Sequence, residues 1–373
     1  MDKKHYCPIP FNHLAIRPNG KVFPCCNFRW EETPEDMDLG YDNLFFDHPF
    51  MKKIRKDLLE DKPVEGCSRC YESEQHTGKS MRTDYIRIAD KLGLSKKEEP
   101  ELTYIDLALS NVCNNKCRMC GPELSTNWYS DAKKLGIEIP RGLLEHKNDL
   151  KEYNLSNLRL IKLIGGEPLM EQEKFIEILE RCTLENLSVL ITTNTTIQPN
   201  KKLLSLLEKC HRVKWNLSID AYGPLNDFLR KGSKWDEIDR NVDWFKETFS
   251  EEFVSIDSVA SIYNINVLHH LIDYAKSKSI PQRYVMCDGP NWMHPRNLPS
   301  KVKLKVKEIL TTKDVPNANY FIHEMEQQGN FKLFVKHDNT FNELRKEHWA
   351  SKNPELLLLL EKYLNEYTEE NIL

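Results

Sequence analysis

Hydrophobic and polar positions in the middle of the chain follow two alternating patterns. Six short runs are apolar or β-branched, and the stretches between them carry apolar residues at helical spacing, as Ile238, Val242 and Phe245 do. The runs lie at 104–109, 158–164, 187–193, 213–219, 253–259 and 283–286. Repeated strand–helix units form parallel sheets with right-handed crossovers, so the pattern predicts an α/β fold. Six strands would form a partial (β/α)6 TIM-like barrel, with chemistry in the loops that follow the strands.

The pattern changes on both sides of this region. Near the start, residues 14–17 and 21–23 flank a Pro-Asn-Gly turn signal, which predicts a hairpin. A helix is predicted over 47–59, with Asp47 as its cap. After the barrel the pattern is helical, and the leucines at 356–360 would pack a last helix inside or, as the alternative, bind a partner. The predicted domains are a small cysteine-rich α+β module at 1–82, a charged linker at 83–102, the barrel at 103–299 and a C-terminal helical cap at 300–373.

Composition narrows the possible partners. The chain has 373 residues with Lys+Arg 53, Asp+Glu 57 and a formal net charge of −4. This balance supplies no broad basic surface, which argues against nucleic acid as a partner. The first residues contain no apolar signal-peptide core, and the longest apolar run is too short to span a bilayer. We therefore expect a cytoplasmic protein with no membrane partner.

Most of the 11 cysteines fall into tight groups. Disulfides are not expected, because the number is odd and cytoplasmic thiols stay reduced. Grouping favours metal or cluster ligation instead. The groups are Cys7, Cys25 and Cys26, then Cys67 and Cys70, then Cys113, Cys117 and Cys120. The isolated Cys182, Cys210 and Cys287 are expected to be small buried side chains, although Cys287 is also a candidate hydrogen-atom donor near the end of the sixth run.

The last group suits an iron–sulfur cluster with one open position. Cys113, Cys117 and Cys120, which we call the cysteine triad, lie on one short segment directly after the first strand run. An iron–sulfur cube normally takes four cysteines, so three local thiolates leave one iron for a ligand that is not protein. Catalytic metal sites keep a position open in the same way.

Three further motifs lie at the ends of successive strand runs. They are Gly165-Gly166-Glu167-Pro168 at the end of the second run, Thr193-Asn194 at the end of the third and Ser218-Ile219-Asp220 at the end of the fourth. Paired glycines let the backbone approach a ligand, and a proline can begin a helix whose N-terminus faces a charged group. Taken alone, each motif would be explained by a turn or a helix cap. Their repeated placement at strand ends favours a ligand site.

Together these motifs resemble those of the radical S-adenosylmethionine (SAM) superfamily. The resemblance covers about residues 103–290 and includes the Arg-Lys-Gly sequence at 230–232. It implies a partial (β/α)6 barrel in which the cysteine triad holds a [4Fe–4S] cluster and SAM binds the open iron. One-electron reduction by a partner such as flavodoxin or ferredoxin would cleave SAM to a 5′-deoxyadenosyl radical, which abstracts a substrate hydrogen.

The resemblance also implies which residues contact SAM. Gly165, Gly166 and Glu167 would contact the methionyl amine, Asn194, Ser218 and Asp220 the ribose or methionyl part, and Arg230 the carboxylate. The guanidinium fork of Arg230 suits a carboxylate; the alternative for this residue is a surface charge on a helix. Met119 stands where the family often has an aromatic residue near adenine, and methionine can fill that space.

The N-terminal cysteines are similar to those of SPASM and twitch modules of radical SAM enzymes, over about residues 5–82. The module precedes the barrel here, whereas it usually follows it. The resemblance implies a second, auxiliary [4Fe–4S] cluster. Its ligands would be Cys7, Cys25, Cys67 and Cys70, with Cys26 as an alternative ligand. Spacing alone also allows a tetrahedral zinc site. Four ligands would close the cluster and favour electron transfer, whereas three would leave room to hold a substrate.

The resemblance implies an enzyme, and modules of this kind accompany enzymes that modify peptides or proteins. We therefore expect a peptide- or protein-directed modification. A small-molecule tailoring enzyme is the main alternative, and RNA modification is a further one. A non-catalytic iron–sulfur or zinc scaffold would have lost a triad cysteine or the Gly-Gly-Glu-Pro motif, and this chain keeps both.

Overall fold

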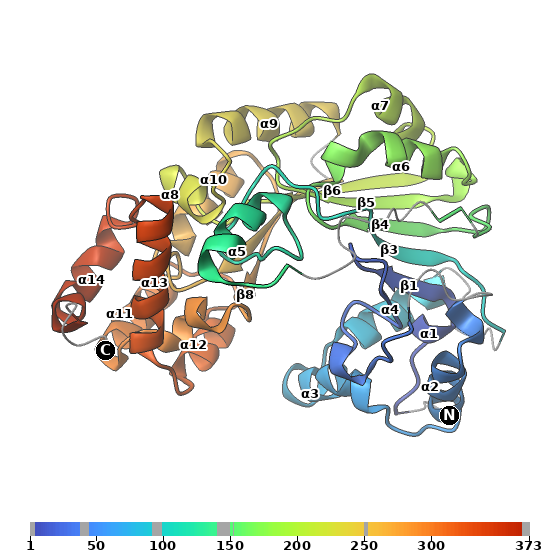
Figure 1. Ribbon diagram of the computed structural model, residues 1–373, viewed down its shortest axis with the longest axis horizontal. Coiled ribbons are helices and arrows are strands. Elements are labelled where there is room, and N and C mark those ends of the chain that lie inside the picture. Colours follow the sequence, from blue (N-terminus) through green and yellow to red (C-terminus); the bar gives the residue numbers. More distant parts are fainter. Residues whose placement is uncertain are drawn as a thin grey trace. The chain divides into compact units, whose positions relative to one another are not determined.

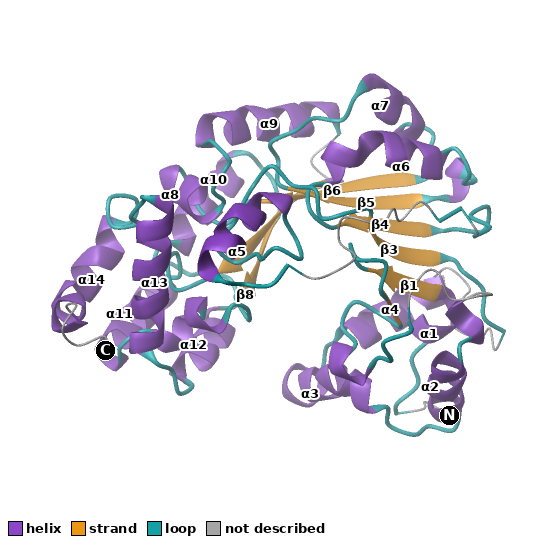
Figure 2. Ribbon diagram, viewed as in Figure 1, coloured by secondary structure: helices purple, strands orange, loops and turns teal. Residues whose placement is uncertain are grey.

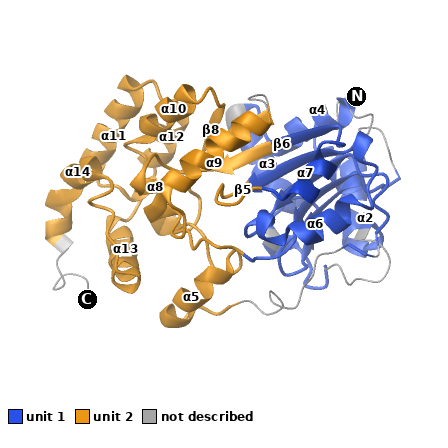
Figure 3. Ribbon diagram, turned by 90° about the horizontal axis from the view of Figure 1, so that it is seen from above, with its two compact units in different colours: residues 1–112, 140–192, 199–214 blue, residues 113–139, 193–198, 215–373 orange. Residues whose placement is uncertain are grey.

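The computed structural model describes residues 4–37, 45–91, 99–139, 150–151, 153–249 and 253–367. The chain forms two compact units, coloured separately in Figure 3. The first comprises residues 1–112, 140–192 and 199–214, and the second comprises 113–139, 193–198 and 215–373. Residues 92–98 of the expected linker lie outside the described residues. The boundaries of the four domains expected from sequence stay predictions.

In the described part of the chain, eight strands follow the order β2-β1-β3-β4-β5-β6-β7-β8 (Figure 1). Their bounds are β1 His13–Ile16, β2 Val22–Phe23, β3 Tyr104–Ala108, β4 Leu160–Ile164, β5 Ser188–Thr193, β6 Arg212–Ser218, β7 Val254–Ala260 and β8 Gln282–Met286. β3, β4 and β5 pair in parallel, as do β6, β7 and β8. β3 to β8 are the six strands predicted from the apolar runs, so the α/β fold of partial-barrel type is confirmed.

The predicted hairpin is also present. β1 and β2 pair antiparallel with Ile16 opposite Val22, and the amide of Arg17 donates to the carbonyl of Lys21 at 2.9 Å. β1 also pairs in parallel with β3, which the sequence did not indicate. The hairpin therefore extends the sheet that carries β3 within the first unit.

The helices of the first unit are α1 Ile9–Asn12, α2 Pro49–Leu59, α3 Ser68–Thr77, α4 Met81–Lys91, α6 Gln172–Leu179 and α7 Lys201–Leu207. α6 and α7 lie along one face of β3 to β5 (Figure 2). The prediction that Asp47 caps α2 is wrong. The ring of His48 accepts a hydrogen bond from the amide of Phe50 at 3.1 Å, and Pro49 begins the helix, where a missing N–H group costs nothing.

The helices of the second unit are α5 Tyr129–Leu135, α8 Pro224–Leu229, α9 Trp235–Thr248, α10 Leu268–Ser277, α11 Ser300–Thr312, α12 Ala318–Glu326, α13 Phe331–Arg345 and α14 Pro354–Leu364. The C-terminal region is helical, as predicted. Within α14, Leu356 and Leu360 are buried, but Leu358 is 77% exposed, because residues four apart share a helix face. Every helix among the described residues is too short or too polar to cross a bilayer.

Candidate functional site

Four cysteines of the first unit line one small pocket. They are Cys7, before α1; Cys25, after β2; Cys67, at the end of the 3-10 helix Glu65–Cys67; and Cys70, in the first turn of α3. Apolar groups, among them Phe28 and Met81, form most of the remaining lining, to which Arg82 adds a positive charge. The fold therefore brings together the four side chains that the sequence predicted as auxiliary-cluster ligands.

The electrostatics of this pocket favour a positive centre. Burial, helped by the charge of Cys70, raises the pKa of Cys67 to about 12. Burial and the charges of neighbouring thiols also raise the pKa values of Cys7 and Cys25. Because each thiolate disfavours its neighbours, ionisation of Cys7, Cys25 and Cys67 together requires a cationic core, which an iron–sulfur cluster supplies. In the described part of the chain, no group of three or more His, Cys, Asp or Glu side chains is arranged to hold a single metal ion.

Cys26 follows Cys25 in sequence but does not line the pocket. Its sulfur lies 3.3 Å from Sδ of Met81, and burial together with the charge of Asp106 raises the pKa of its thiol to about 12. This arrangement favours Cys25 over Cys26 as the ligand.

The cysteine triad lies in the second unit, on residues 113–120, which we call the cysteine loop. Its backbone is held by residues 229–232, the template segment. The amides of Lys116 and Arg118 donate to the carbonyls of Lys231 and Leu229 at 2.7 and 2.8 Å. Gly232 has a φ of +115°, and a Cβ there would lie 2.6 Å from the carbonyl oxygen of Asn114. The Arg-Lys-Gly motif at 230–232 therefore has a structural role, because this segment forms backbone hydrogen bonds with the loop that carries the thiols.

Polar groups surround the triad sulfurs. The amide of Asn115 lies 3.4 Å from Sγ of Cys113, and Nδ2 of Asn194 lies 3.9 Å from the same sulfur. A hydrogen bond from Cys120 lowers the pKa of Cys117, and the charge of Arg230 lowers it further, while the same bond raises the pKa of Cys120. Cys117 and Cys113 are buried and Cys120 is half-buried. These three thiols have the donor chemistry and surroundings that a cluster needs.

The paired glycines lie in the first unit, where β4 ends. Gly165 has a φ of +118°, and a Cβ on Gly166 would lie 2.3 Å from the carbonyl oxygen of Val112. The amide of Gly166 donates to Ser110 at 3.1 Å, and that of Glu167 donates to Val112 at 2.7 Å. Glycine is therefore required for this segment to cross over residues 110–112, which lead directly into the cysteine triad.

Glu167 and Asn194 are both buried. The carboxylate of Glu167 accepts a hydrogen bond from the amide of Leu169 at 3.1 Å and caps the 3-10 helix Pro168–Glu171. Asn194 Nδ2 also donates to Asn114 on the cysteine loop at 2.7 Å. Both side chains thus have local structural partners, and their contacts with SAM stay predictions.

Arg230 is not a surface charge, so that alternative is wrong. Its side chain is 12% exposed, and its Nε lies 2.7 Å from Oδ2 of Asp220. Asp220 is completely buried, and its Oδ1 also accepts from the amide of Val259 at 2.8 Å. The Asp220 carboxylate therefore holds the guanidinium in place. A guanidinium has five N–H donors, so one carboxylate does not exhaust it.

The remaining predicted residues have less distinctive positions. Met119 is half-buried on the cysteine loop, and Ser218 is half-buried at the end of β6. Cys287 is buried as expected, and its thiol donates to the carbonyl of Gly289 at 3.3 Å. The expectation that Cys182 and Cys210 are buried is wrong: both are half-buried, three residues beyond the ends of α6 and α7.

Sequence reasoning missed several residues around the cysteine loop. Trp128 donates from Nε1 to the carbonyl of Cys117 at 2.8 Å, and Arg118 is completely buried between two triad cysteines in sequence. The position of Arg118 between two candidate ligands could have indicated its role from sequence. No sequence feature indicates the role of Trp128, because its contact depends on the path of the chain after the loop.

Two protein-family models match the chain. A model of the radical SAM superfamily matches residues 107–271, and a model of the SPASM iron–sulfur cluster-binding domain matches residues 7–71. The chain therefore contains a radical SAM domain and an N-terminal SPASM domain, as the motifs indicated. It is an enzyme whose cofactors are a [4Fe–4S] cluster, SAM and an auxiliary iron–sulfur cluster, and it requires a reductant.

Similar proteins include curated enzymes and solved structures. GTP 3′,8-cyclase of Helicobacter pylori strain J99 is 26% identical over 241 residues, which is 63% of this chain and 69% of that one. GTP 3′,8-cyclase of Nautilia profundicola is 24% identical over 260 residues, 66% of this chain and 77% of that one.

Among solved structures, anSMEcpe with bound AdoMet is 16% identical with a TM-score of 0.41, covering 64% of this chain and 66% of that one. SuiB of Streptococcus suis is 16% identical with a TM-score of 0.38, covering 76% of this chain and 60% of that one. This chain thus spans less than two thirds of SuiB and about two thirds of anSMEcpe. At these TM-scores the two likenesses carry no argument about substrate.

Replacing Gly166 should destabilise the protein before any cofactor is bound. A Cβ there would meet backbone at 2.3 Å, so Gly166→Ala should lower the free energy of unfolding by about 2 kcal/mol, seen as a lower melting temperature of the cofactor-free protein. Gly289→Ala, where a Cβ meets nothing within 4 Å, is the control and should melt within a degree or so of wild type. Equal melting of the two variants would contradict the close crossing at Gly166.

Proposed function

We propose that this enzyme cleaves SAM reductively and abstracts a hydrogen from a peptide or protein substrate. The observation that carries the first part is the cysteine loop, on which a backbone template presents three buried or half-buried thiols from one short segment. When bound, the cluster and SAM supply a 5′-deoxyadenosyl radical after one-electron reduction, for which flavodoxin or ferredoxin is the proposed partner.

The residues of the chain would then bind and orient the cofactors. The cysteine triad would hold the cluster, and Gly165, Gly166 and Glu167 would meet the methionyl amine. Arg230, fixed by Asp220, would offer its remaining N–H donors to the methionyl carboxylate. The other proposed contacts are Asn194 and Ser218 at the ribose or methionyl part and Met119 at the adenine.

The pocket in the first unit supports an electron-transfer role for the auxiliary cluster. Four cysteines line it, and with four protein ligands a cube has no iron left to bind substrate. A closed cluster of this kind suits a reaction in which an electron leaves the substrate after hydrogen abstraction. Peptide or protein modification of that type is our proposal for the SPASM-containing chain.

Modification of a small molecule is the second candidate. It is favoured by the relatives named GTP 3′,8-cyclase, a name that specifies a nucleotide substrate. At 26% identity or less the substrate of a relative does not transfer to this chain by itself.

Iron content distinguishes Cys25 from Cys26 as the auxiliary ligand. Anaerobically reconstituted wild-type protein should hold about eight irons, four per cube. Cys25→Ser should fall to about four irons, and Cys26→Ser, whose side chain lies outside the pocket, should keep about eight. About four irons together with stoichiometric zinc in the wild type would rule out the auxiliary cluster.

Formation of 5′-deoxyadenosine tests the role of the triad. With dithionite and SAM, the wild type should release this product, and Cys117→Ala should reduce it by at least about 100-fold because a cluster ligand is lost. Cys182→Ala removes an isolated thiol and is the matched control, expected to match wild type. Equal yield from Cys117→Ala and wild type would refute the assigned role of the triad.

Isotope transfer separates the two substrate classes. Deuterated candidate peptides and deuterated GTP are incubated separately with reduced enzyme and SAM, and the label in 5′-deoxyadenosine is measured by mass spectrometry. The proposal predicts label from a peptide and none from GTP. Label from GTP alone would establish the small-molecule alternative in its place.

A further inference from the structure

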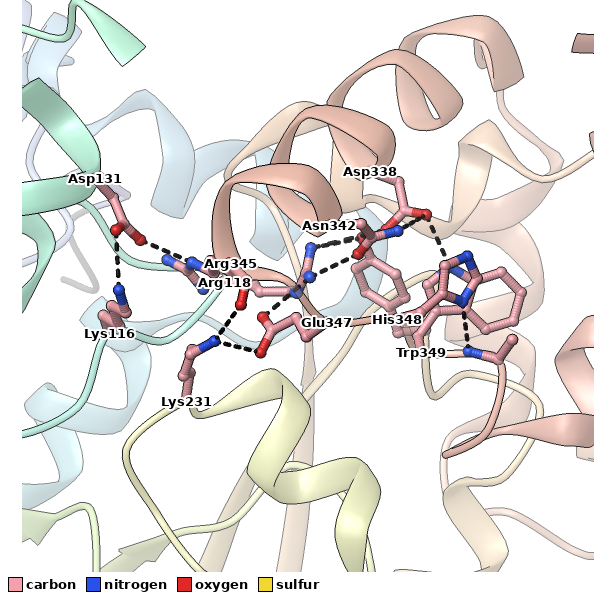
Figure 4. Close-up of polar contacts among 12 residues, drawn as sticks. Lys116, Arg118, Asp131, Lys231, Asp338, Asn342, Arg345, Glu347, His348 and Trp349 are labelled. Atoms are coloured by element: carbon pink, nitrogen blue, oxygen red, sulfur yellow. Dashed lines mark hydrogen bonds and ion pairs between the residues drawn. The ribbon is translucent and has the colours of Figure 1, made fainter. Parts of the chain in front are cut away.

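The cysteine loop carries basic side chains that are not ligands, and these are bound by Asp131 of α5 and by the C-terminal region of the same unit (Figure 4). Nζ of Lys116 lies 2.9 Å from Oδ1 of Asp131, and Nε of Arg345, at the end of α13, lies 2.8 Å from Oδ2 of that carboxylate. Lys231 of the template segment lies 2.8 Å from Oε2 of Glu347. The C-terminal region thus reaches both the cysteine loop and the segment that templates it.

Arg118 makes the most buried of these contacts. Its Nη2 donates to Oδ1 of Asn342 at 2.9 Å and to Oε1 of Glu347 at 3.1 Å. Its guanidinium also lies 4.0 Å from the ring centre of Phe228. Because the side chain is completely buried, its charge cannot be rehydrated if these partners are lost.

Asp338 fixes these partners in turn. Its carboxylate accepts hydrogen bonds from Tyr263 at 2.6 Å, Trp349 at 2.8 Å and Asn342 at 2.9 Å, and it lies 3.7 Å from Nη1 of Arg118. The three donors to this carboxylate are thus Asn342, on α13 itself, and two side chains from outside that helix. A displacement of α13 would displace Arg118, and with it the backbone between two triad cysteines.

The net charge of the network is opposite in sign to that of the thiolates on the cysteine loop. Its basic members are Lys116, Arg118, Lys231 and Arg345, and its acidic members are Asp131, Asp338 and Glu347. Fully ionised, it has an excess of one positive charge beside a loop whose ligand form carries three thiolates. Charge and hydrogen bonding around an iron–sulfur cluster govern its stability and potential.

Packing alone does not account for the four buried charges of this network, which are Arg118, Asp131, Asp338 and Arg345. Buried ion pairs are on average no more stabilising than well-packed apolar side chains of the same volume, because desolvation offsets their attraction. A directional network, unlike an apolar contact, fixes the position and orientation of the backbone that carries it. A loop that holds a cluster with one open position requires its backbone to be fixed in this way.

We propose that α13 and residues 345–349 form a clamp on the cysteine loop, in which Arg118, Asp338 and Glu347 are positioning residues for the SAM-binding cluster. The inference rests on the proposed function, since it takes the triad as the ligands of that cluster. It adds that cluster retention depends on a segment more than 200 residues away in sequence.

Glu347→Gln tests the clamp, because it removes the charge that binds both Arg118 and Lys231 while keeping side-chain size. Glu326→Gln, which breaks only an exposed pair with Lys307 in the same unit, is the matched control. Full-length proteins are reconstituted anaerobically, and iron release to a chelator and the EPR signal of the reduced protein are recorded with and without SAM. Glu347→Gln should release iron about tenfold faster, only from the cluster whose signal SAM perturbs, and Glu326→Gln should match wild type.

Lys231→Gln is a second variant that should fold, because its side chain is 31% exposed. It should show the same selective loss with an unchanged melting temperature of the cofactor-free protein. The proposal is overturned if both variants release iron at the wild-type rate, or if both clusters are lost together with a lower melting temperature. Either of those results leaves the proposed function intact. A wild type with no SAM-perturbed signal would remove the proposed function and the clamp together.

Discussion

The arrangement of the whole site depends on one constraint. Three thiols must be held close together on a short loop, although their thiolate forms repel one another. Sulfur ligands bind iron as thiolates, and burial makes each thiolate unfavourable next to the others. The chain meets this constraint with backbone pairing, since the amides of Lys116 and Arg118 bond to the template segment. It adds positive charge nearby: a hydrogen bond from Cys120 lowers the pKa of Cys117, and the charge of Arg230 lowers it further. Thiol geometry is thus set by groups that are not ligands.

The two cysteine sites differ in how they are built. The SPASM pocket gathers four thiols from segments that are separate in sequence, around an apolar lining. The triad takes three thiols from one loop and relies on neighbouring segments for rigidity. In our proposal, the first design closes a cluster with four protein ligands, and the second leaves one position for SAM. This contrast is the physical basis for assigning electron transfer to one centre and SAM chemistry to the other.

Much of the fold could be predicted from the sequence, because strand periodicity and motif spacing are local properties. The six barrel strands, the hairpin and the triad all follow from residues close together along the chain. Choices between neighbours were harder: His48 rather than Asp47 caps α2, and Cys25 rather than Cys26 lines the pocket. In each case the two candidates are adjacent in sequence, and the packing around them determines which one makes the contact.

Long-range partners could not be predicted at all. Nothing near β1 indicates that it pairs with β3, and nothing near Arg118 indicates Asn342 or Glu347. A buried arginine needs acceptors, but sequence does not say which of many polar residues supplies them. The sheet extension and the clamp are therefore results of the structure.

Mössbauer spectroscopy of isotopically enriched iron tests the central claim most directly, because it resolves the individual irons of a cube. In Cys25→Ser protein, which would hold only the triad cluster, SAM should change the isomer shift of one iron in four and leave the other three unchanged. A spectrum in which SAM alters no iron would contradict a cluster held at three corners by Cys113, Cys117 and Cys120.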